Sequence, residues 1–518
     1  MEIWNYISIL RKSEKSSFWS KTTDISERIG ALNFIKLNGN PNLISELIPV
    51  LKSKNLELRS RAFEVIKSFY ENIDSGKTLY QSLKYCQISK KDLDFFKNSF
   101  SSEDYLILVS IATYNFDGYV REQAIDELGN FGASVIILNP LLHRLSDWVE
   151  INREKAKKII NDLKQINNLQ YFAEQIQDID KLKKVQRTDL TDIYNDLVKF
   201  IVEENKVEVF LDFGEYSDKK RILLARLFIK SSSLDIDDLK IFINDKHFLI
   251  RSLVLKRFDL LGDEEIKSLL ADKSSKIRVN TLYALENDEN ISDIAYEFLA
   301  DSSSSIRNFA RFVLKNKNID FKEFYNKNLQ ENRDVEGSIY GLKEVGGKEF
   351  IKEVIPFLDS QFIRITRAAF NMIKEFEQKT AYKFALNNMN SNAVGIGKMS
   401  IEYLYKNPTS EVIEKAKSLF HSENLQLKKS MLKLFSKIGK YKGLDEILNG
   451  TIDEDREIRI LSKAYLKDWI SKSSKYFISP TEDEIKLIRI AVEKVNLQLK
   501  EDDHITAETL KEIEFHIR

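Results

Sequence analysis

The sequence has little of three residue types that interrupt helices or crosslink chains. Its 518 residues include 6 prolines, 17 glycines and one cysteine, Cys86. Proline and glycine both disfavour helix interiors, so their scarcity favours a mainly helical chain. A lone cysteine excludes an intramolecular disulfide and agrees with a reducing compartment. We therefore expect a cytoplasmic protein.

The sequence also lacks an excess of charge of one sign and any long apolar run. Lys+Arg and Asp+Glu both number 80, which excludes a global attraction to nucleic acid or to anionic membranes. No apolar run approaches the roughly 20 residues that span a bilayer. The first residues, MEIWNYISILRKSEKS, carry neither a basic region ahead of an apolar run nor a cleavage site, so we expect no signal peptide and no membrane partner.

What the sequence does contain is a repeat. The stretch from Asp301 to Asn316 has Ile306-Arg307, then Ala310 and Leu314, on one helical period. The same pattern recurs along the chain, from Arg59 to Arg459, with an average interval of about 31 residues. Where the arginine is missing, we place the register on Glu336, Ile365, Gly397 and Lys428. Two helices fit in each interval, so the sequence predicts an all-α chain of stacked helix pairs.

The pattern Asp-x4-(Ile/Val)-Arg-x2-Ala-x3-Leu resembles the second helix of HEAT repeats, and the resemblance covers nearly the whole chain. The short period is similar to that of phycobilin-lyase-type HEAT proteins. The resemblance implies an α-solenoid of about 13–15 two-helix repeats. In such arrays the repeated arginine pairs with the aspartate of its own or the next turn, and we expect ion pairs here rather than a row of phosphate-binding groups. Asp301 with Arg307 and Asp272 with Arg278 have identical offsets.

Breaks in the repeat predict the domain organisation. We expect N-terminal repeats over residues 1–163, with an irregular insertion at about 75–102, and C-terminal repeats over residues 220–474. Residues 164–219 fit either a long helix pair or a hinge. Residues 475–518 read as a helical cap, in which Thr481 and Glu484 have the spacing of a capping box.

The residues give little sign of catalysis, and we expect no enzyme, no cofactor and no metal. The five histidines have no metal-ligand spacing. Gly395, Gly397 and Lys398 lack the remaining glycine of a phosphate-binding loop. Asp147-Trp148 near Arg153 is similar to the residues that HEAT-like alkylpurine DNA glycosylases use, but Asp147 and Trp148 occupy the turn of the repeat, which favours a structural role.

Positions that vary on the repeat are the candidates for binding. Five residues after the arginine register, four successive repeats lose their charge and three carry an aromatic residue. We predict an apolar binding trough on the concave surface, because exposed aromatic side chains anchor interfaces. The alternative is that these rings pack between adjacent helices. The trough residues would be Tyr283, Asn287, Asn308, Phe312, Asn316, Gly341 and Phe370.

A second candidate is basic. Residues 361–480 carry a net charge of about +8, and four lysines follow one helical edge: Lys429, Lys433, Lys437 and Lys440. This stripe is either a solvated face or a contact for nucleic acid. The sequence as a whole predicts a protein-binding scaffold, adaptor or inhibitor that holds another protein or peptide. The alternative is a nucleic-acid-binding protein or a relative of the DNA glycosylases.

Overall fold

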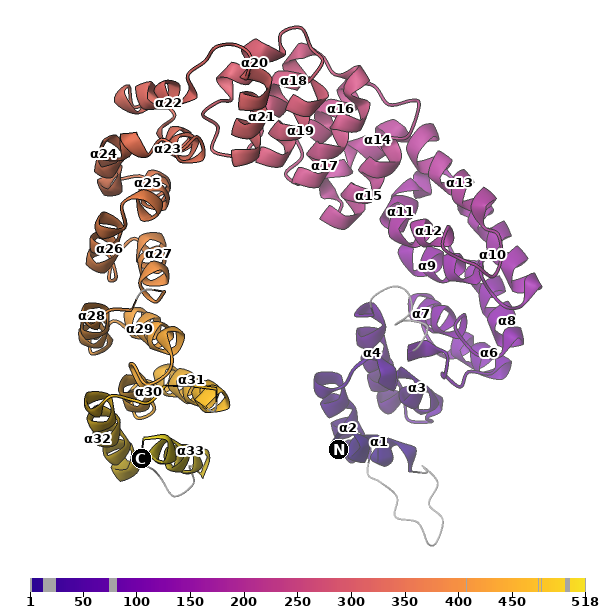
Figure 1. The fold of residues 1–518 in the computed structure, drawn as a ribbon. Helices are drawn as coiled ribbons and strands as arrows, with labels where there is room; N and C mark the ends of the chain where they lie inside the picture. Colours follow the sequence, from indigo (N-terminus) through magenta and orange to yellow (C-terminus); the bar gives the residue numbers. More distant parts are fainter. Residues whose placement is uncertain are drawn as a thin grey trace. The chain divides into compact units, whose positions relative to one another are not determined.

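The computed structural model describes residues 2–12, 25–73, 82–406, 408–473, 475–476, 478–498 and 504–517. Within these ranges the regular secondary structure is helical, with no β-strand (Figure 1). Neighbouring helices along the chain pack on each other, and this confirms the predicted all-α fold of stacked helix pairs, an α-solenoid. The chain forms two compact units, Met1–Thr281 and Leu282–Arg518.

The first unit contains pairs in which the second helix carries the repeat pattern. These second helices are α2 (Ile25–Asn38), α4 (Leu56–Glu71), α8 (Gly118–Leu128), α10 (Glu150–Leu163), α15 (Asp218–Phe228), α17 (Phe248–Leu253) and α19 (Ser275–Ala284), the last of which runs into the second unit. Before them come α1 (Glu2–Arg11), α3 (Ile44–Leu47) between η1 (Pro41–Leu43) and η2 (Ile48–Lys52), α7 (Ser102–Ala112), α9 (Val135–Arg144), α14 (Lys206–Leu211), α16 (Ile236–Ile243) and α18 (Asp263–Leu270).

The irregular parts of the first unit are short helices. In the insertion expected at about 75–102, residues 82–102 are described and hold α6 (Lys90–Ser99), while residues 75–81 lie outside the described residues. Residues 164–219 lie inside the first unit. Besides α14 and the start of α15, these residues form η3 (Ile166–Asn168), α11 (Leu169–Glu174), α12 (Ile176–Leu182), α13 (Thr191–Lys199), the π-helical η4 (Phe200–Glu204) and η5 (Phe213–Glu215). Later in the first unit, η6 (Val254–Leu260) follows α17.

The second unit continues the pairing. Its second helices are α21 (Ser304–Leu314), α23 (Val335–Glu344), α25 (Ile363–Phe376), α27 (Val394–Leu404), α29 (Leu425–Ile438) and α31 (Arg456–Ser473). Their partners are α20 (Ile291–Glu297), α22 (Phe321–Gln330), α24 (Ile351–Val354) between η7 (Lys348–Phe350) and η8 (Ile355–Asp359), α26 (Gln378–Asn387), α28 (Ser410–Phe420) and α30 (Leu444–Gly450). Figure 1 shows α25, α27, α29 and α31 along one side of this unit and α24, α26, α28 and α30 along the other.

The chain ends in the pair α32 (Glu482–Gln498) and α33 (His504–His516), which pack on α30 and α31 respectively. The capping box at the start of α32 is present, because the Thr481 N–H donates to Glu484 at 2.8 Å and the Glu484 N–H donates to the Thr481 hydroxyl at 3.3 Å. The predicted helical cap therefore packs as a further helix pair.

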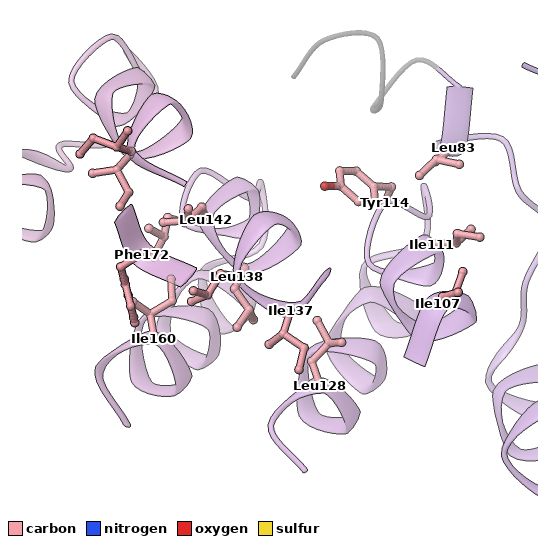
Figure 2. Packing of buried hydrophobic residues seen from close by; sticks show 14 of the residues in the cluster. Leu83, Ile107, Ile111, Tyr114, Leu128, Ile137, Leu138, Leu142, Ile160 and Phe172 are labelled. Carbon is pink, nitrogen blue, oxygen red and sulfur yellow. The ribbon is translucent and has the colours of Figure 1, made fainter. Parts of the chain in front are cut away.

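Apolar side chains fill the space between successive pairs, as the repeat pattern requires. Figure 2 shows Ile137 of α9 facing Leu128 of α8, with Leu138 and Ile160 beside Phe172. All of these side chains are buried. Each pair therefore completes its core with the pair that follows it.

The repeated arginine has one position in the fold, the fourth residue of the second helix. From there its guanidinium reaches back to the backbone carbonyl six residues earlier, as Arg251 does to Asp245 at 2.9 Å and Arg307 to Asp301 at 2.6 Å. It also reaches the carboxylate of the next turn. Such pairs are Arg121–Asp147, Arg221–Asp245, Arg251–Asp272 and, with lysine in place of arginine, Lys428–Asp453. The predicted ladder of ion pairs is confirmed between successive turns. The aspartate of the arginine's own turn accepts through its backbone carbonyl instead, and Arg307 pairs with Glu344.

This position also corrects the predicted register in two repeats. In α25 the Thr366 hydroxyl, not Ile365, donates to the carbonyl six residues earlier, that of Ser360, at 3.0 Å. In α23 the fourth helical residue is the buried Ser338, not Glu336. The assignments to Ile365 and Glu336 were wrong by one and two residues, because neither repeat retains the arginine that marks the others.

Candidate functional site

The predicted aromatic trough is only partly on the surface. Tyr283 and Phe312 are 54% and 67% exposed, but Phe370 is 1% exposed. Its ring packs on Phe384 and Tyr403, with centroid distances of 5.5 and 5.4 Å. The prediction that Phe370 lines the trough was therefore wrong, since the one-residue shift in register turns a helical position by about 100°.

Gly341 is also part of the core rather than of an open surface. It is buried in α23, and a Cβ atom placed on it would lie 2.3 Å from the ring of Tyr325. The glycine leaves room for that ring, whose hydroxyl donates to the Leu299 carbonyl at 3.0 Å. The prediction that Gly341 lines the trough was therefore wrong, because Tyr325 fills the space beside it.

The remaining trough residues lie on or just after α19 and α21. Asn287, Asn308 and Asn316 are exposed, as are Tyr283 and Phe312. The Tyr283 ring packs edge-on against Phe309 of α21 at 4.9 Å, and the Lys315 ammonium lies 4.8 Å from the Phe312 centroid. What remains is a small aromatic pair with polar neighbours, and a binding role for it stays a prediction.

A larger site lies further along the second unit. A hollow of about 1210 Å³ is lined by residues of α25, α26 and α27 and by Glu411 at the start of α28. The polar lining residues are Arg367, Asn371, Lys374, Glu375, Gln378, Lys379, Tyr382, Lys383, Lys398, Glu402, Tyr403, Lys406 and Glu411. Beside it is a hollow of about 580 Å³ between α27, α29 and α31. The two share Lys398 and Glu402, and we refer to both together as the basic groove.

The second hollow contains most of the predicted basic stripe. Lys429, Lys433 and Lys437 line it, with Gln426, Tyr405 and Tyr465. Lys440 does not continue the stripe, because α29 ends at Ile438 and the next two residues, Gly439 and Lys440, both have positive φ. The expectation that all four lysines share one helical edge was wrong at Lys440.

Most charges in the basic groove are positive. Its described lining contains nine cationic and three anionic side chains, the latter being Glu375, Glu402 and Glu411. Among the described residues, no carboxylate lies within 4.0 Å of the charged group of Arg367, Lys374, Lys379, Lys383, Lys398, Lys433 or Lys437. The groove thus presents positive charge that the protein itself does not neutralise.

Lys374 of α25 lies on the wall of the first hollow. Desolvation, together with the nearby ammonium groups of Lys343 and Lys406, lowers the pKa of Lys374 below its ordinary value. The Arg367 guanidinium lies close to α27 at Gly395, which has no side chain. A Cβ atom at that position would lie 2.9 Å from the guanidinium. An anionic ligand in the groove would relieve the repulsion among these cations.

Sequence reasoning missed the first hollow. Arg367, Lys374, Lys379 and Lys398 belong to three helices, so no spacing along the chain connects them. The excess positive charge of residues 361–480 is the one signal in the sequence that points to this region. Phe370 was singled out as a contact residue, and it forms part of the floor of the same hollow.

The residues that are similar to those of DNA glycosylases have structural roles. Asp147 is buried and accepts hydrogen bonds from Arg121 and Arg144, at 2.7 Å from each, and from the Val149 N–H at 2.9 Å. Trp148 is exposed, with the Arg187 guanidinium 3.5 Å from its ring centroid. Arg153 donates to the Asp147 carbonyl at 3.0 Å. These contacts hold the turn before α10, as the turn position predicts.

The described residues contain no group of three or more His, Cys, Asp or Glu side chains that could hold a metal ion. They also contain no helix with the length and apolar character of a membrane span.

Comparisons with known proteins find a distant likeness in fold. No family model and no curated protein matches the sequence. Among solved structures, a crystal structure of a Kap121p mutant is similar with 14% identity and a TM-score of 0.31, and the match covers 100% of this chain and 57% of that one. A structure of Kap95p with RanGDP, from work on nuclear import complex assembly, is similar with 11% identity and a TM-score of 0.30, covering 100% of this chain and 66% of that one. The chain thus spans less than two thirds of either match, and scores this low carry no functional conclusion.

Proposed function

We propose that this protein is a non-enzymatic scaffold that binds another protein in the basic groove of its second unit. The observation that carries the proposal is the pair of adjoining hollows on α25, α27, α29 and α31, which share Lys398 and Glu402. Concave sites with a few convergent polar groups are where proteins bind ligands. We place the protein in the cytosol on its composition, and its repeat period remains similar to that of phycobilin-lyase-type HEAT proteins.

The exposed pair Tyr283 and Phe312 is a second candidate contact within the same function. Aromatic side chains are common interface anchors, and these two project from neighbouring second helices. We rank the basic groove above the pair because the groove combines depth with seven cations that have no carboxylate partner among the described residues.

The test is capture of binding proteins from the native source by the full chain and by two double variants. Lys398→Glu with Lys433→Glu reverses two exposed charges in the groove. Lys317→Glu with Lys352→Glu makes the same change at exposed positions in the second unit that do not line the groove. We expect the groove variant to lose at least one protein that the control variant keeps.

Equal capture by both variants would overturn the proposal. Circular dichroism melting of each variant shows whether it is folded, and both should melt within a few degrees of the natural protein because the four lysines are exposed. Changes at exposed positions usually alter stability by about 0.5 kcal/mol or less.

A further inference from the structure

The charges that line the groove indicate which chemical groups the bound protein carries. Elsewhere in the second unit, cations that face the protein have carboxylate partners, as Lys417 has Asp445 and Lys428 has Asp453. In the groove Arg367, Lys374 and Lys398 have none within 4.0 Å among the described residues. These cations are gathered on one concave surface, so an incoming anion could pair with several of them at once.

From this charge pattern we infer that the groove takes an extended, acidic segment of another protein, rich in aspartate and glutamate. The inference rests on the proposed function and adds the chemical class of the partner. Carboxylate side chains match separate lysine ammonium groups, each of which is a compact point charge.

The length of the segment follows from the helices that line the groove. Four successive second helices, α25 to α31, contribute to it, and packed helices lie about 8–10 Å apart. Three such intervals cover about 24–30 Å, which an extended chain of about seven to nine residues spans at about 3.3–3.6 Å per residue. Alternate side chains of such a segment point to the same side, so about four or five carboxylates can face the groove.

Two features favour a peptide over a single-stranded nucleic acid. Glu375, Glu402 and Glu411 lie among the cations, and Glu402 belongs to both hollows. A nucleic acid carries a phosphate at every nucleotide and cannot avoid them, whereas a peptide can place a neutral residue opposite each glutamate.

The second feature is that three tyrosines of the groove, Tyr382, Tyr403 and Tyr405, already contact other side chains. Tyr403 packs edge-on against Phe370 at 5.4 Å, and the Tyr382 hydroxyl lies 2.5 Å from that of Thr409 and 3.2 Å from Glu411. The Lys406 ammonium lies 6.0 Å from the Tyr405 centroid. Binding of single strands depends on ring faces that are open for base stacking.

The experiment uses three fluorescent probes and measures anisotropy with the full-length protein at 150 mM salt. The first probe is a nine-residue peptide that alternates glutamate with serine, the second has glutamine in place of glutamate, and the third is a nine-nucleotide single strand of thymidylate. We expect the acidic peptide to bind at least 10-fold more tightly than either of the others. Lys398→Glu with Lys433→Glu should weaken the acidic peptide about 30-fold, and Lys317→Glu with Lys352→Glu less than 2-fold.

Every other outcome contradicts the inference and shows which part of it is wrong. If the thymidylate strand binds more tightly than the acidic peptide, the groove binds nucleic acid. If the glutamine peptide binds as tightly as the glutamate peptide, the groove does not recognise carboxylates. If the groove variant loses its captured protein but the acidic peptide does not bind, the scaffold function stands and the acidic segment is wrong. If Lys398→Gln with Lys433→Gln leaves peptide binding unchanged, the site itself is wrong.

Discussion

Arg251 of α17 joins two successive turns of the first unit. Its guanidinium donates to the Asp245 carbonyl in its own turn at 2.9 Å, and to the Asp272 carboxylate in the next turn at 2.6 and 3.0 Å. Both side chains are buried. One side chain thus fixes the start of its own helix and the position of the following pair, and the equivalent contacts recur at Arg121 and Arg221.

Loss of this arginine should destabilise the fold. Arg251→Ala leaves the buried Asp272 without its partner, and breaking a buried pair on one side costs about 3–5 kcal/mol. Arg61→Ala is the matched control, because Arg61 and Glu64 form an exposed pair of the kind that contributes about 0–1 kcal/mol. Urea unfolding measures the free energy of unfolding of both variants. Equal losses in the two variants would contradict the structural role of the repeated arginine.

The first unit should lose stability in acid through Asp147. Burial alone would raise the pKa of Asp147, but its hydrogen bond from Arg121 and the charge of Arg144 hold that pKa below the ordinary value. A carboxylate with a depressed pKa contributes stability above its unfolded-state pKa of about 3.9, and the contribution is lost as pH falls through the folded-state pKa. Asp147→Asn should therefore be less stable at pH 7, and the difference from the natural protein should narrow below about pH 4. A difference independent of pH would exclude an ionised Asp147.

Two phenylalanines of the predicted trough should behave differently. Phe370→Ala empties a packed site and should cost about 3–5 kcal/mol. Phe312→Ala removes an exposed ring and should change stability by about 0.5 kcal/mol or less. Thermal unfolding of both variants tests the corrected register, and a loss at Phe370 as small as that at Phe312 would restore the original one.

Gly341 should not tolerate a methyl group. A Cβ there would overlap the ring of Tyr325, so Gly341→Ala should destabilise the second unit by about 1–3 kcal/mol. Gly30→Ala in α2 is the control, since nothing lies within 4 Å of the added atom and alanine favours a helix interior by about 0.5–1 kcal/mol. A stabilising Gly341→Ala would mean that Tyr325 moves freely.

The sequence predicted the fold through one chemical signature. Asp272 and Arg278, or Asp301 and Arg307, identify a turn and the helix after it, because the arginine must reach a carbonyl six residues back. Where serine or threonine takes the arginine's place, as at Ser338 and Thr366, the signature disappears. A short hydroxyl in that position does not show in a charge pattern, and the register was lost there.

The groove could not be predicted in the same way. Its helical cations come from four helices: α25, α26, α27 and α29. Arg367 and Lys398 are 31 residues apart in the sequence, and it is the stacking of α25 and α27 that lines one hollow with both. A ladder of ion pairs is local in sequence, whereas a binding surface on a helical repeat depends on neighbouring repeats.

The most direct test of the binding surface is site-specific photo-crosslinking. A photoreactive residue is placed at Gln378 in the first hollow, at Gln426 in the second, or at Phe312 on the exposed aromatic pair, all of which are solvent-exposed. Each variant is mixed with extract of the native source and irradiated, so that bound proteins are crosslinked to it. The crosslinked partner is then identified by mass spectrometry. The account predicts one partner crosslinked from both Gln378 and Gln426, through an acidic stretch of its sequence. Crosslinks from Phe312 alone would contradict it.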